Sequence, residues 1–248
     1  MSKHTFLRIV RAIARVVLGI IARIQIIGNV DYQTGGYIIV ANHVGRLEAF
    51  LVLMLAERDD IVLLLAEKYK AYAFWRYVAR KVDGIWVNRF DADFGALRVV
   101  LKRLEKGEVL AIAPEGTRSP TATLLPGKPG ATYLAAKSGL PLIPIGIVGT
   151  EDSVVKYRLK RLRRLDITVR VAEPYTLPEM PKRGRDEWLQ AQTDDMMCRI
   201  AALLPADHRG VYADHPRLIE LLRENGSPFP EDKALLEVWD DGRQTTDH

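Results

Sequence analysis

The chain has very little cysteine, because Cys198 is the single cysteine among its 248 residues. One thiol excludes an internal disulfide framework and a cysteine-based metal cluster. The surrounding segment, Met-Met-Cys-Arg-Ile-Ala-Ala-Leu-Leu, has helical spacing. Cys198 is therefore expected to be a small buried apolar residue in a protein of a reducing compartment.

Long apolar runs are also missing. Four arginines interrupt the first 24 residues, whereas a membrane span needs about 20 predominantly apolar residues in a row. At about 100° per residue, one helix face carries Arg8, Arg11, Arg15 and Arg23, and the opposite face carries Phe6, Val10, Ile13, Val17, Ile20 and Ile24. Residues 1–27 are therefore expected to form a basic amphipathic helix. It would lie in an anionic lipid interface or pack on the protein's own core.

Three chemical signatures are absent. No Gly-x-Ser-x-Gly block supports a serine hydrolase. The segment Gly127-Lys128-Pro129-Gly130 lacks the glycine spacing and the serine or threonine of a nucleotide phosphate loop. No cluster of metal ligands is recognisable either, so we expect neither a metal nor a bound cofactor.

The overall amino-acid composition is that of a folded, basic domain. Hydrophobic residues make up 48% and charged residues 27%, and the net charge is +5, which favours an anionic partner. The basic run 156–164 would suit nucleic acid, membrane headgroups or the phosphates of a donor, or it is a solvated hairpin. No nucleic-acid motif accompanies it, so nucleic acid is not expected as a partner.

Apolar strands and helical patterns alternate along the chain. Strands are expected at residues 37–41, 61–65, 84–87, 109–113, 142–148 and 167–171, and helices at 47–57, 69–81, 92–106, 131–137 and 187–204. This alternation predicts an α/β fold: a single layered domain with a mostly parallel sheet flanked by helices. The expected division is an N-terminal helix over 1–27, the main domain over 28–205 and an accessory tail over 206–248 that wraps the domain or frays.

A histidine and a carboxylate follow the first buried strand. His43 and Glu48 are five residues apart, and Gly45 between them permits a turn that brings them together. A carboxylate that holds one ring nitrogen leaves the other able to take a proton from a hydroxyl at neutral pH. The pair is a candidate general base and its orienting group.

Three further segments carry candidate binding residues. The strand at 84–87 leads to Arg89, and the strand at 109–113 leads to Pro114-Glu115-Gly116-Thr117-Arg118-Ser119. Arginine and threonine bind phosphate oxygens, glycine permits close approach, and Glu115 would orient an arginine or a substrate hydroxyl. The segment 139–149 has two prolines and three glycines, which is typical of an edge strand or of the end of a strand and would suit the wall of an apolar groove.

In this order, from Asn42 to Gly149, the four segments resemble the glycerolipid acyltransferases typified by 1-acylglycerol-3-phosphate acyltransferase. The resemblance implies that His43 is the base, with Glu48 in place of the usual aspartate. It implies an acceptor site of Arg89, Glu115, Gly116, Thr117 and Arg118, with Lys128 in the following spacer. It also implies that Pro141, Ile143 and Pro144 line the acyl or donor side. The related lipid-A-type enzymes use glutamate at this spacing.

The resemblance implies transfer of a fatty acyl group from acyl-CoA or acyl carrier protein to a lysophosphatidic acid-like hydroxyl. The protein would be peripheral (monotopic) on the cytoplasmic face of an anionic membrane. The alternatives are acylation of another lysolipid or glycolipid acceptor, a non-catalytic lipid-binding protein of the same fold, and a thioesterase-like hydrolase.

Overall fold

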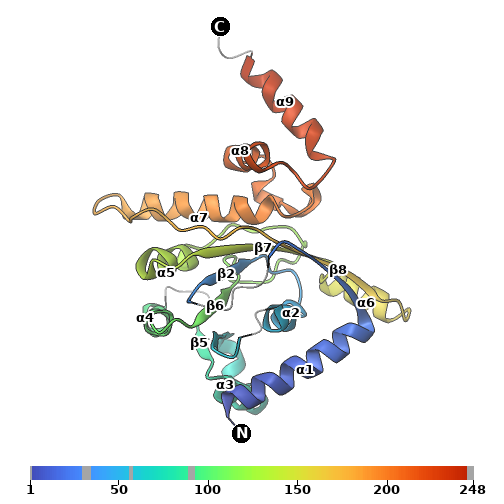
Figure 1. The fold of residues 1–248 in the computed structure, drawn as a ribbon, viewed down its shortest axis with the longest axis vertical. Coiled ribbons are helices and arrows are strands. Elements are labelled where there is room, and N and C mark those ends of the chain that lie inside the picture. The colour runs from blue at the N-terminus through green and yellow to red at the C-terminus, as the bar shows by residue number, and fades with distance from the viewer. Residues whose placement is uncertain (1, 30–34, 56–57, 89–92, 245–248) are drawn as a thin grey trace.

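A computed structural model describes residues 2–29, 35–55, 58–88 and 93–244. Six strands form the main sheet in the order β1-β8-β7-β2-β6-β3 (Figure 1). They are β1 (Ala22–Ile27), β2 (Ile38–Ala41), β3 (Ile61–Val62), β6 (Val109–Ile112), β7 (Leu142–Val148) and β8 (Leu165–Val171). Neighbours are parallel except β7 and β8. The expected α/β fold with a mostly parallel sheet is confirmed.

A second sheet pairs β4 (Leu64–Ala66) in parallel with β5 (Ile85–Val87). The strand expected at 61–65 is thus divided between two sheets. Between β4 and β5 the chain forms the 3-10 helix η1 (Glu67–Ala71) and then α3 (Ala73–Val82).

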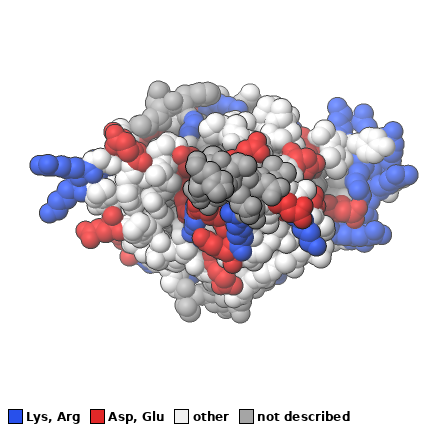
Figure 2. Space-filling model, turned by 90° about the horizontal axis from the view of Figure 1, so that it is seen from above, with Lys and Arg blue, Asp and Glu red and all other residues white. Residues whose placement is uncertain are grey.

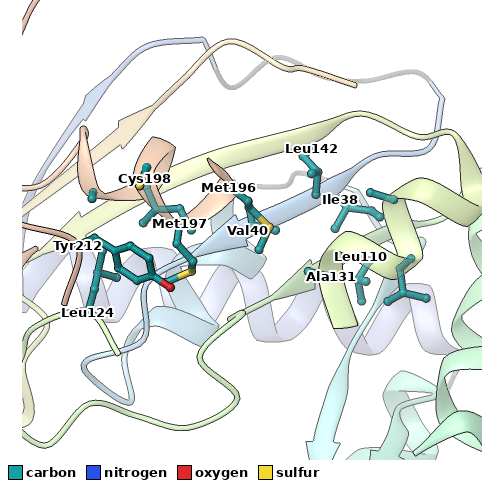
Figure 3. Packing of buried hydrophobic residues seen from close by; sticks show 14 of the residues in the cluster. Ile38, Val40, Leu110, Leu124, Ala131, Leu142, Met196, Met197, Cys198 and Tyr212 are labelled. Carbon is teal, nitrogen blue, oxygen red and sulfur yellow. The ribbon is translucent and has the colours of Figure 1, made fainter. Parts of the chain in front are cut away.

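The two faces of the main sheet bury different helices, because strand residues alternate between them. Ile38 and Val40 of β2 face the first core, which α4 (Phe94–Leu104), α5 (Gly130–Ser138), α7 (Arg185–Ala201) and α8 (Pro216–Asn225) cover. Figure 3 shows Met196, Met197 and Cys198 of α7 in this core. Cys198 is completely buried, as expected.

The opposite face packs on the first two helices of the chain. Ile39 and Ala41 of β2 lie in a second core with Leu18 of α1 (Lys3–Ile21) and Leu51 of α2 (Glu48–Leu55). A third, smaller core joins α1, α2, β3 and α3. The helix α6 (Asp152–Leu159) follows β7 and packs beside β8.

The N-terminal segment differs from the expected single helix. The helix ends at Ile21, and residues 22–27 form the edge strand β1, since the isoleucines at 24, 26 and 27 favour an extended chain. Arg11 does not face solvent: its guanidinium donates to the Leu53 carbonyl at 3.1 Å and to Asp59 Oδ1 at 3.1 Å. One face of α1, with Leu7 and Leu18, packs on the core, and the opposite face, with Ile13 and Ile20, stays exposed.

The C-terminal segment packs on the rest of the domain. The 3-10 helices η2 (Ala206–His208) and η3 (Gly210–Tyr212) lead to α8, whose Leu218, Leu221 and Leu222 lie in the first core. At the start of α9 (Asp232–Gln244), Asp232 forms a fully buried bidentate ion pair with Arg209, at 2.7 and 2.6 Å. Leu204 and Tyr212, on the two sides of the boundary expected at residue 205, lie in the same first core.

No helix among the described residues has both the length and the apolar character that crossing a bilayer requires.

Candidate active site

Three adjacent strands bring the candidate residues to one edge of the sheet. β7, β2 and β6 are neighbours and parallel, so the loops after their carboxyl ends lie side by side. These loops hold residues 149–151, 42–47 and 113–119. Sites of parallel α/β sheets form at this edge.

His43 and Glu48 meet directly. His43 Nδ1 lies 2.5 Å from Glu48 Oε2. A carboxylate accepts, so Nδ1 carries the hydrogen and the neutral ring has its unshared pair on Nε2. The Glu48 side chain is 5% exposed and the His43 side chain 22% exposed. Among the described residues Nε2 has no hydrogen-bond partner, which leaves it open toward a substrate hydroxyl.

Glu48 is held by three further donors. Its Oε1 accepts from the amides of Val44 at 2.8 Å and Gly45 at 2.7 Å and from Thr150 Oγ1 at 2.9 Å. Gly45 permits this turn, because a Cβ there would come within 1.8 Å of the Thr150 carbonyl oxygen. The carboxylate is therefore fixed before any substrate binds.

Glu115 has a different role from the expected one. It is 2% exposed, and its two oxygens accept from the backbone amides of His43 at 2.7 Å and Leu125 at 3.0 Å. Burial raises the pKa of this carboxyl to about 7. Glu115 therefore positions the backbone of His43, and among the described residues it forms no bond with Arg118.

Arg118 lies beside the His43 loop but is paired with an acid. Its Nη1 donates to Asp152 Oδ2 at 2.8 Å, while Asp152 Oδ1 accepts from the Arg46 amide at 3.2 Å. Thr117 is exposed next to it. The Lys128 side chain crosses Gly116, since a Cβ on that glycine would come within 3.1 Å of it. The structure thus brings Thr117, Arg118 and Lys128 to one side of the site.

The remaining predicted site residues lie elsewhere. Arg89 is outside the described residues. Ile143 is 2% exposed in the second core, so it does not line a groove. β7 is an interior strand, so of the two positions that its prolines indicated, an edge strand or a strand end, only Pro141 at the start of the strand fits. Pro144 is accommodated inside the strand because its carbonyl accepts from Ala172, one residue beyond β8, so its missing amide hydrogen falls outside the ladder. Pro141, before β7, is half-buried.

Thr150 and Asp152 were not among the residues predicted from the sequence. Both directly follow the strand 142–148, and polar residues at the carboxyl end of a buried strand were the available signal. His208, in the C-terminal segment, is a further residue with acidic partners near the site. His208 Nε2 lies 3.3 Å from Glu151 Oε1 and its Nδ1 lies 2.7 Å from Asp207 Oδ1. The bond to Glu151 is the main cause that raises the pKa of His208 to about 9.

Within the described parts of the chain, no three histidine, cysteine or acidic side chains are grouped closely enough to hold a metal ion.

Comparison with known proteins gives consistent results. The chain is 27% identical over 187 residues to a 1-acyl-sn-glycerol-3-phosphate acyltransferase of Cocos nucifera, covering 75% of this chain and 55% of that one. The Saccharomyces cerevisiae protein of the same name is 24% identical over 178 residues, 70% of this chain and 58% of that one. A lyso-ornithine lipid O-acyltransferase of Rhizobium meliloti is 27% identical over 147 residues, 58% and 48% of the two chains. The chain thus spans about half the length of these curated relatives.

The crystal structure of the 1-acyl-sn-glycerophosphate (LPA) acyltransferase PlsC from Thermotoga maritima has a similar fold. The TM-score is 0.55 at 20% identity, covering 75% of this chain and 76% of that chain. A family model described as Acyltransferase matches residues 23–148, about half of the sequence and all of β2, α2, β5 and β6. With its histidine and carboxylate in contact inside this region, the chain belongs to the acyltransferase family.

Proposed function

We propose that the protein transfers a fatty acyl group from a thioester to the free hydroxyl of a lysophosphatidic acid-like glycerolipid. The observation that carries the proposal is the contact between His43 and Glu48, which leaves Nε2 of the ring unpaired among described residues at the edge where Arg118 lies. Relatives named as 1-acyl-sn-glycerol-3-phosphate acyltransferases support this choice of acceptor.

In the proposed mechanism His43 Nε2 takes the proton of the acceptor hydroxyl as its oxygen attacks the thioester carbonyl carbon. The new C–O ester bond forms, the C–S bond breaks, and the imidazolium returns the proton to the leaving thiolate. Glu48 stabilises the imidazolium without accepting its proton. Neither step needs a metal or an electron carrier.

The Leu47 amide is our candidate for stabilising the oxyanion. The amides of Val44 and Gly45 are occupied by Glu48, and the Arg46 amide by Asp152. The Leu47 amide has no hydrogen-bond partner among the described residues and lies at the start of α2, where the helix dipole favours negative charge.

Arg118, Thr117 and Lys128 are the candidates for holding the acceptor's phosphate, with Arg89 as a further candidate from the sequence. The ion pair of Arg118 with Asp152 offsets part of the local positive charge. A lysolipid with a cationic headgroup is therefore the second acceptor to test. The relative named as a lyso-ornithine lipid O-acyltransferase supports the same choice.

We also propose that the protein is peripheral on the cytoplasmic face of an anionic membrane and docks through α1. The solvent side of this helix exposes five large aliphatic residues by 45 to 68%: Ile9, Ile13, Val16, Val17 and Ile20. A stripe of this kind suits the boundary between headgroups and acyl chains.

The proposal is tested by mass spectrometry of lipids after incubation with a panel of lyso-acceptors. Lysophosphatidic acid and lyso-ornithine lipid are each supplied with acyl-CoA or acyl carrier protein as donor. We expect the mass of phosphatidic acid to appear with one donor at least. Release of free fatty acid alone would indicate a hydrolase, and unchanged lipids with every pair would indicate a non-catalytic lipid-binding protein.

A further inference from the structure

The turn that joins α6 to β8 places a large apolar residue in water. Leu162 is 97% exposed, the highest value among the exposed large apolar residues. Its φ is +53°, a left-handed conformation that disfavours side chains other than glycine and asparagine. The turn is nevertheless ordered, since the Leu162 amide donates to the Leu159 carbonyl at 3.1 Å. Neither the backbone strain nor the exposure of Leu162 helps the chain to fold.

Cations surround this leucine. Lys156, Lys160, Arg161 and Arg163 are all exposed, and none of them forms an ion pair with an acid that the structure describes. We call residues 156–163 the basic tip. Figure 2 shows lysine and arginine gathered at the end of the molecule where α6 lies.

The basic tip is joined to the proposed membrane helix. The next residue, Arg164, donates through Nη2 to the Gly19 carbonyl at 2.7 Å and also to the Ala22 carbonyl. These carbonyls are at the carboxyl end of α1, beside the exposed Ile20. The tip therefore lies next to the carboxyl end of α1 (Figure 1).

The chemistry of the tip favours lipid over nucleic acid. Nucleic acid would use Tyr157 for stacking, but the Arg161 guanidinium already occupies one face of that ring at 3.8 Å from its centroid. An exposed leucine among cations that have no acidic partner in the described part of the chain matches a lipid surface, where the side chain enters the acyl region and the cations meet phosphates.

We propose that the basic tip is a second membrane contact, which inserts Leu162 between the headgroups of an anionic bilayer and fixes the rotation of the protein about α1. This inference rests on the proposed peripheral association. It assigns the contact to a segment outside the matched family region, which ends at residue 148.

A fluorescent label at position 162 tests the contact directly. Cys198 is buried, so the Leu162→Cys variant takes a thiol-reactive environment-sensitive dye at the tip. Ile13→Cys on α1 and Val211→Cys, exposed by 61% on η3, serve as membrane and solvent controls. On vesicles of phosphatidylglycerol and phosphatidylcholine we expect blue-shifted, brighter emission from the dye at positions 162 and 13. The emission of the dye at position 211 should not change.

The outcomes separate the two proposals. A response at 13 without one at 162 overturns the second contact and leaves docking through α1 intact. The absence of a response at both positions overturns both the docking through α1 and the second contact. Acyl transfer in detergent micelles tests catalysis separately from membrane binding. A response at 162 to duplex DNA instead of vesicles would show a nucleic-acid surface.

The Leu162→Gly variant separates folding stability from membrane binding, because it should weaken binding without lowering stability. Glycine relieves the left-handed strain, so the melting temperature should stay equal or rise. Loss of the inserted side chain should weaken partition onto anionic vesicles roughly tenfold. A Lys160→Ala, Arg163→Ala double variant should weaken it by about 30-fold. Unchanged partition in both variants would overturn the proposal.

Discussion

Single residues decide whether His43 can act as a base. The carboxylate of Glu48 accepts from the His43 ring, two backbone amides and Thr150. These donors fix the longer glutamate side chain, so the added methylene relative to aspartate does not free the carboxylate. The sequence predicted the contact between His43 and Glu48 from spacing and Gly45. It did not predict Thr150, because that residue is 102 positions away from Glu48.

Changing the orienting carboxylate should lower kcat more than it changes KM. Glu48→Gln keeps the shape but removes the charge that stabilises the imidazolium, and we expect kcat to fall about 10²- to 10³-fold. Thr150→Val removes one of four donors, and we expect a fall of about fivefold with stability lower by about 1 kcal/mol. Steady-state kinetics with lysophosphatidic acid measure both. An effect confined to KM would contradict the assigned roles.

His208 should make stability depend on pH above neutrality. Its pKa is raised from 6.5 to about 9, so the folded state favours the protonated ring. This stabilisation is fully present below pH 6.5 and is lost as the pH rises through 9. We expect it to supply ~1 kcal/mol of the free energy of unfolding at pH 7 and little at pH 10.

Urea unfolding at pH 7 and pH 10 measures this difference. The His208→Gln variant should lose most of the dependence, whereas His4→Gln, at a site exposed by 66%, should keep it. The range from pH 7 to pH 10 lies above the one in which Glu115 contributes most. The raised pKa of Glu115 makes stability fall as the pH rises from 4.5 through about 7. Equal slopes in His208→Gln and wild type would refute the assignment.

At the scale of elements, α1 shows what periodicity predicts and what it leaves open. The helical spacing indicated two faces, but none of the buried residues of the helix belongs to the expected apolar face. These buried residues are Leu7, Arg11, Ala14 and Leu18. The acceptors of Arg11, the Leu53 carbonyl and Asp59, become its neighbours only through folding. The strand β1 was missed for a similar reason, since its pairing partner β8 is more than 130 residues away.

The two faces of α1 should respond differently to substitution. Ile13→Asp with Ile20→Asp should weaken binding to anionic vesicles at least tenfold and change the free energy of unfolding by no more than about 0.5 kcal/mol. Leu7→Ala, on the buried face, should cost about 2–4 kcal/mol of stability. Vesicle sedimentation and urea unfolding give the two readouts, and large destabilisation by the aspartates would show that this face packs on protein.

At the scale of the molecule, the parallel sheet explains why motifs far apart in sequence form one site. The order of β7, β2 and β6 places their carboxyl ends together, and the alternation of strands and helices predicted this arrangement. The sequence could not predict the antiparallel β8 or the packing of residues 206–244, because the buried pair of Arg209 and Asp232 has no local pattern.

The most direct test of the account is acyl transfer by the His43→Ala variant. Labelled acyl thioester and lysophosphatidic acid are supplied to the variant and to wild type, and acceptor binding is measured in parallel. We predict that wild type forms labelled phosphatidic acid and that the variant loses at least 10³-fold in rate while acceptor affinity changes less than about threefold. Undiminished transfer by the folded variant would contradict the central claim that the His43 imidazole is the base.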